Sequence, residues 1–259
     1  MIHFEQAVSG FSSKQEGEWQ IATPEAQLFI FSEGSGKKKE TRLAMDRLQE
    51  VISHHFLAEP HPVLRVRQFF LQVINTAHFE LIELATQEAV TGVTLIMVII
   101  QQGQIHWAKV GNGALYLVSG RNSEEYISAD NYPRKGTAEE GESQIGDAKR
   151  MPTIEFGGPF TLNRSDLLLL CSQTYRTTLG DKALLAGSDT TDSLTAWLKD
   201  LTAVVKGRIK PGDSDLKAIA LKVSEIEAVT PPPVAIPLDR VGASRTFSSA
   251  ITLQTRWLR

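Results

Sequence analysis

Three apolar runs of strand length, joined by very short connections, limit most strongly how this chain can fold. The runs are VTLIMVII (93–100), QIHWAKV (104–110) and ALYLVSG (114–120). The segment QQGQ joins the first two, and Gly-Asn-Gly before the third is a strong turn signal. Connections this short suit antiparallel neighbours, so the sequence predicts a meander of three strands.

Other patterns surround this meander. Apolar residues recur at helical spacing over 40–56 and over a longer helix after the break AEPHP at 58–62. Two short strands are expected in 19–31, on either side of Pro24, and a final strand in 216–223. FTLNRSDLLLLCS (160–172) predicts a hairpin, and helices are expected near 179–186 and 190–206.

This order predicts an α+β fold, a sandwich of two antiparallel sheets with helices outside. Three consecutive prolines in TPPPVAIP (230–237) mark a change of composition. We therefore expect one domain over 1–226, followed by a proline-rich linker and basic tail over 227–259. In the tail, Arg256 and Trp257 are candidate interface anchors. A disordered terminus and an extra strand of the domain's own sheet are the alternatives.

Composition argues against several classes of partner. Charged residues make up 22% of the chain and the net charge is −3, which gives no general case for nucleic acid or an anionic membrane. No apolar run approaches the roughly 20 residues of a spanning helix. The N-terminus lacks the pattern of a signal peptide. The single cysteine favours a reducing compartment, so we expect a cytoplasmic protein.

Two residue types that often carry chemistry have a simpler interpretation here. His54, His55 and His61 match no standard zinc spacing, and the adjacent pair is expected to cap carbonyls at a helix end. Cys171 lies in an apolar run and is expected to be a buried, inert thiol.

Six short motifs follow one another in a recognisable order: SSKQEG (12–17), LFIFSEGSGK (28–37), GVT (92–94), WAKVGNGALYLV (107–118), DLLLLCSQT (166–174) and DSDLKAIALKV (213–223). Their order and spacing resemble the metal-dependent, type 2C serine/threonine protein phosphatases from about residue 8 to 224. The resemblance implies an αββα sandwich, with two packed antiparallel sheets flanked by helix pairs.

Active members of that family bind two Mg²⁺ or Mn²⁺ ions between the sheets, through carboxylates that suit hard divalent cations. The resemblance places the metal-site positions on these residues: Gly17, Glu33, Gly34, Gln173 and Ser214. Glu33 is the one carboxylate in register, and Gly34 supplies the backbone carbonyl of the pattern. A shift of one residue would recover Asp213 or Asp215. The phosphate-holding arginine of the family falls near Ser12.

The resemblance therefore predicts a pseudophosphatase without a metal cofactor. Its expected role is regulatory or scaffolding, with a kinase, an active phosphatase or a larger assembly of a Ser/Thr phosphorylation pathway as partner. One alternative is a divergent phosphatase with a single metal held by Glu33, Asp213 or Asp215. Another is a metal-free phosphopeptide-binding module that uses Lys37, Lys38 and Lys39, residues that otherwise form a solvated basic loop.

Overall fold

The computed structural model describes residues 2–9, 18–34, 38–90, 92–120, 122–128, 143–188, 193–209 and 216–226. The chain divides into two units, Met1–Ala228 and Val229–Arg259. Arg256 and Trp257 lie outside the described residues, and the predicted boundary after 226 stays a prediction.

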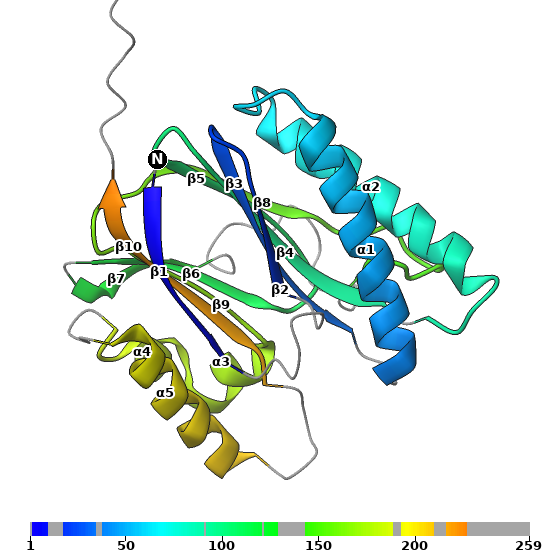
Figure 1. Cartoon of the computed structure of the whole chain (residues 1–259). Helices are drawn as coiled ribbons and strands as arrows, with labels where there is room; N and C mark the ends of the chain where they lie inside the picture. The colour runs from blue at the N-terminus through cyan, green and yellow to red at the C-terminus, as the bar shows by residue number, and fades with distance from the viewer. Residues whose placement is uncertain are drawn as a thin grey trace, which may run out of the picture. The chain divides into compact units, whose positions relative to one another are not determined.

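Two five-stranded antiparallel sheets form the centre of the first unit (Figure 1). The first sheet has the order β1 (Ile2–Ser9), β10 (Ala218–Ile226), β9 (Leu167–Cys171), β6 (Ala114–Ser119) and β7 (Asn122–Ser128). The second has the order β2 (Glu18–Ala22), β3 (Ala26–Gly34), β4 (Val93–Gln101), β5 (Gln104–Val110) and β8 (Glu155–Thr161). The predicted strands on either side of Pro24 are β2 and β3.

Helices cover the outer face of each sheet, which confirms the predicted αββα sandwich (Figure 1). The second sheet is covered by α1 (Lys38–Ala58) and α2 (Val66–Ala85). The first is covered by α3 (Gln173–Leu179), α4 (Asp181–Leu185) and α5 (Leu194–Arg208). None of the helices in the described ranges combines the length and the apolar character that a bilayer crossing requires.

Two predicted strand pairings are wrong, because both connections cross between the sheets. The β4–β5 hairpin forms as predicted, but β6 pairs with β9 and β7 in the other sheet. The predicted hairpin over 160–172 is likewise split, since β8 pairs with β5 and β9 pairs with β10 and β6. At the second crossing, Asp166 Oδ2 accepts the backbone N–H of Asn163 at 2.7 Å and stabilises the turn.

The first crossing depends on a close approach by Gly111. This residue has φ of 84°, and a Cβ atom there would lie 2.6 Å from Thr94 Oγ1. Glycine alone accepts this combination of a left-handed backbone and contact with the neighbouring strand. The turn after β5 therefore leaves the second sheet and starts β6 in the first.

An apolar layer fills the space between the sheets. It contains alternate residues of the facing strands, among them Phe31, Val98, Trp107, Leu170 and Leu221. All nine residues of β4 are buried, because the first sheet covers one face of this strand and α1 and α2 cover the other.

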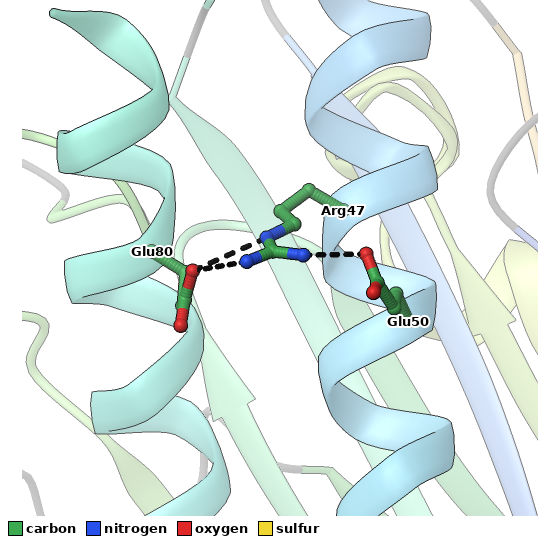
Figure 2. Close-up of polar contacts among 3 residues, drawn as sticks. All are labelled: Arg47, Glu50 and Glu80. Carbon is green, nitrogen blue, oxygen red and sulfur yellow. Dashed lines mark hydrogen bonds and ion pairs between the residues drawn. The ribbon is translucent and has the colours of Figure 1, made fainter.

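A polar contact links the two helices on the second sheet (Figure 2). The guanidinium of Arg47 in α1 donates from Nε and Nη2 to Oε2 of Glu80 in α2, at 3.2 and 2.5 Å. Its Nη1 donates to Glu50 Oε2 at 2.5 Å. These hydrogen bonds, led by that to Glu80, raise the pKa of Arg47. Because all three side chains are at least a third exposed to water, we expect the contact to stabilise the protein by no more than about 1 kcal/mol.

Gln101, at the end of β4, binds the connection between α1 and α2, and its contribution to stability can be tested. Its side-chain amide accepts from the N–H of Val63 and donates to the carbonyl of Val63, each at 2.9 Å, in a buried position. Gln101→Ala leaves both backbone groups of Val63 without a partner, so unfolding in urea should show a loss of about 2–4 kcal/mol. Gln104→Ala, at an exposed position, is the control. If both substitutions lowered the free energy of unfolding by the same small amount, this role of Gln101 would be contradicted.

Candidate functional site

The motif residues within the described ranges meet at one end of the sandwich. Here β3 ends and β4 begins, with Glu33 opposite Thr94 and Gly34 opposite Val93. In the other sheet, Cys171 at the end of β9 lies opposite the first residues of β6 and β10. The short turn between β5 and β6 brings the two strand ends together. We call this region the Glu33 end of the sandwich.

Glu33 points into the space between the two sheets. Its neighbour Ser32 faces the other way and donates a hydrogen bond to Met45 Sδ of α1 at 2.9 Å. Because side chains alternate along a strand, Glu33 shares the inter-sheet face with Phe31. Burial raises the pKa of the Cys171 thiol, and the negative charge of Glu33 raises it further. Cys171 is fully buried, which confirms the predicted burial of this thiol.

Gln173 and Ser172 continue this end of the first sheet. Ser172 donates its backbone N–H to the carbonyl of Lys217 at 2.9 Å, and its hydroxyl accepts the N–H of Lys217 at 3.4 Å. Gln173 follows as the first residue of α3 and is partly buried. Gln173 thus places a neutral amide at a position that the sequence resemblance assigns to the metal site, at the start of a helix packed on the sheet.

Asn112 lies in the crossing turn, within the motif WAKVGNGALYLV. Thr94 donates its hydroxyl proton to Asn112 Oδ1 at 3.3 Å. The Thr94 side chain also contacts Gly111 closely enough to exclude a Cβ atom. Thr94 and Asn112 thus place neutral polar groups at this end of the second sheet.

Two buried lysines at this end were missed by the sequence analysis. Lys109 is 2% exposed and shares the inter-sheet face of β5 with Trp107, since Ala108 and Val110 face the helices. Its Nζ atom lies 3.8 Å from Glu155 Oε2 at the start of β8. Lys217 is 5% exposed and lies one residue before β10, beside Ser172. A lysine inside the apolar run QIHWAKV was the signal that could have revealed the first.

The charges of these described groups balance. Glu33 and Glu155 contribute two negative charges, and Lys109 and Lys217 contribute two positive ones. Two divalent cations would add four positive charges, and the Glu155 carboxylate already lies beside the ammonium of Lys109. The described residues of the Glu33 end, which exclude Gly17 and 213–215, therefore form a donor set that does not fit a pair of metal ions.

Within the described ranges, no three His, Cys, Asp or Glu side chains gather as metal ligands. Four of the residues considered as site positions or as replacement ligands lie outside those ranges: Gly17, Asp213, Ser214 and Asp215. Metal binding through Asp213 or Asp215 therefore stays a prediction, as does the assignment of Gly17 and Ser214.

The candidate lysines 37–39 and the histidines near the end of α1 do not belong to the group of residues at the Glu33 end, or are only partly described. Lys37 is outside the described residues, whereas Lys39 is exposed in the first turn of α1. Of the three histidines near the end of α1, His61 is the one that contacts a helix carbonyl, through Nε2 and the oxygen of Phe56 at 2.9 Å. The predicted capping role thus belongs to His61 in the following turn.

Solved bacterial serine/threonine phosphatases share this fold. A phosphatase of S. agalactiae has a TM-score of 0.65 at 19% identity, over 86% of this chain and 100% of that one. Stp1 from Staphylococcus aureus has a TM-score of 0.66 at 16% identity, over 87% and 96%. The catalytic domain of PstP in complex with two manganese ions has a TM-score of 0.60 at 13% identity, over 87% and 100%.

No protein-family model matches the sequence, and no curated protein matches it either. The chain therefore has the fold of type 2C-like serine/threonine phosphatases, and the identities of 13–19% carry that statement to the fold alone.

The ion pair of Lys109 and Glu155 can be tested by a double-mutant cycle. Lys109→Met removes the ammonium from a carboxylate that is only 19% exposed, so the free energy of unfolding should fall by about 2–3 kcal/mol. Adding Glu155→Gln should recover most of this loss, because the neutral pair no longer leaves a charge unbalanced.

Lys199→Met, on the exposed face of α5, is the matched control and should change stability by no more than about 0.5 kcal/mol. If Lys109→Met were as neutral as this control, the charge balance assigned to the Glu33 end would be wrong.

Proposed function

We propose that this chain is a catalytically inactive phosphatase-like protein that acts by binding another protein. The observation that supports the proposal is the presence of buried lysines and a neutral amide at the Glu33 end, where the resemblance places the metal site. Lys109 Nζ lies 3.8 Å from Glu155 Oε2, Lys217 is buried beside Ser172, and the amide of Gln173 lies at a position that the resemblance assigns to the metal site.

Metal-dependent phosphoryl hydrolysis needs a water molecule whose pKa is lowered by bound divalent ions. Lysines held between the sheets disfavour a cation in the same space, and each carboxylate used for a lysine is lost as a ligand. The fold is kept, whereas the groups that would perform the chemistry differ.

The proposed partner is a protein of a Ser/Thr phosphorylation pathway, either a kinase, an active phosphatase or an assembly that contains them. This part of the proposal rests on the fold shared with serine/threonine phosphatases. We propose that this binding takes place in the cytoplasm and without a cofactor. Arg256 and Trp257 are the proposed anchors in the tail.

Activity measurements test the absence of catalysis. With millimolar Mn²⁺ or Mg²⁺, hydrolysis of an aryl phosphate and of a phosphoserine peptide should not exceed the buffer rate. Glu33→Ala and the control Glu88→Ala, at an exposed position after α2, should behave like the wild type. Divalent-dependent turnover that Glu33→Ala abolishes and Glu88→Ala preserves would establish instead a divergent phosphatase with a rearranged metal site that uses Glu33, Asp213 or Asp215.

A second candidate function is metal-free binding of a phosphorylated peptide. It is favoured by the placement of Lys38 and Lys39 at the start of α1, where the helix dipole is positive and extra cations are unfavourable unless an anion is near. Lys37 precedes them in the sequence. The same residues form an ordinary basic surface if no anion binds.

Replacing Lys37, Lys38 and Lys39 together with Ala should weaken the binding of a phosphoserine peptide at least tenfold and reduce its dependence on salt. Lys199→Ala with Lys206→Ala removes exposed lysines of α5 and serves as the control. Fluorescence anisotropy at two salt concentrations measures both effects. Equal affinity of the triple variant and the wild type would remove this candidate.

A further inference from the structure

We propose that His78 acts as a pH-sensitive latch, which holds the segment 143–147 against α2 and against the first residue of β4. Neither the phosphatase fold nor the proposed binding function requires such a latch. The inference rests on a hydrogen bond, a strand contact and a close packing contact that meet in one place.

The hydrogen bond defines the protonation of the ring. His78 lies in α2 and is 1% exposed. Its Nδ1 atom accepts the backbone N–H of Gly146, with 3.1 Å between the two nitrogen atoms. An Nδ1 atom that accepts a hydrogen bond carries no proton, so the ring is neutral and its proton is on Nε2.

The packing of Gly146 brings the segment directly onto the helix. Gly146 has φ of 85°, and a Cβ atom there would lie 2.9 Å from Cβ of Leu81, about one turn of α2 beyond His78. Glycine therefore permits both the backbone conformation and the close approach that the hydrogen bond to His78 needs.

The strand contact connects this segment with the Glu33 end. Ile145 and Val93 exchange two backbone hydrogen bonds of 2.9 Å, as in an antiparallel pair. Val93 is the first residue of β4 and also lies opposite Gly34 in β3. Since β5 ends opposite Leu95, Ile145 occupies the place beside β4 that β5 has left. Release of the segment would uncover this strand end.

The charges around the ring determine the direction of the pH effect. Burial lowers the pKa of His78, and the carboxylate of Asp147, in the latched segment, opposes this only in part. The residues one turn away on α2 are uncharged: Ile74, Asn75, Leu81 and Ile82. Asp147 is the charged group whose field acts on the ring among the described residues.

The latched state therefore favours the neutral ring, whereas the released ring has its ordinary pKa of 6.5. Because the folded pKa is lowered, the contribution of the latch is complete above pH 6.5 and is lost as the pH falls below it. Linkage limits the increase in opening between pH 7.5 and pH 5.5 to about tenfold for one histidine.

Amide hydrogen exchange of the full chain, corrected for the intrinsic effect of pH, measures this opening. In the wild type, protection of the Ile145 and Gly146 amides should fall by up to about tenfold from pH 7.5 to pH 5.5. His78→Asn keeps an acceptor oxygen near the position of Nδ1 but does not titrate, so its protection should be independent of pH. His106→Asn is the control, since burial also lowers the pKa of His106 in β5, and it should keep the wild-type pH dependence.

The nitrogen chemical shifts of His78 in the wild type test the same point if His78→Asn does not fold. They should show an Nε2–H tautomer at pH 7.5 and titration below pH 6.5. An Nδ1–H tautomer at pH 7.5 would overturn the latch. So would protection of Ile145 and Gly146 that stays constant through the titration of His78, or an equal pH dependence in wild type and His78→Asn.

Discussion

The apolar layer between the two sheets is the contact on which the rest of the structure depends. Facing strands contribute large side chains such as Phe31, Trp107 and Leu170, all nearly inaccessible to water. Burial of this kind contributes about 25 cal/mol for each Å² of apolar surface and requires the sheets to lie about 10 Å apart. The crossing turn after β5 lies at the Glu33 end and brings strand ends from both sheets together there, whereas the crossing after β8 lies at the opposite end of the sandwich.

Any group that points between the sheets at this end leaves bulk water, so its charge must be balanced locally. Divalent cations and carboxylates can provide such a balance, and PstP has been solved in complex with two manganese ions. In this chain Lys109 lies beside Glu155, Lys217 is buried at the same end, and Asn112 and Gln173 are neutral. In our proposal these groups replace a metal site, and the apolar layer and the glycine turns hold the strand ends in place without it.

The sequence predicted the layers of the sandwich well, because they follow from short-range patterns. Helical periodicity identified α1 and α2, apolar runs beside glycine turns identified β4 and β5, and the apolar run of 167–171 identified β9. The two edge strands β1 and β7 were missed, since β1 buries only Ile2 and Ala7 and shows no regular alternation. The strand pairing after Gly111 and Asn163 was wrong because a tight turn has the same sequence signal whether it forms a hairpin or crosses to the facing sheet. Lys109 was missed for a related reason, since a strand buried on both faces does not reveal which face a polar residue occupies.

Calorimetric titration of the folded protein with MnCl₂ and MgCl₂ tests most directly the claim that this fold has exchanged a cation site for internal charge balance. The account predicts no heat of binding up to millimolar metal at pH 7.5. Saturable binding that is lost in Glu33→Ala would contradict it, because the carboxylate would then serve a metal ion.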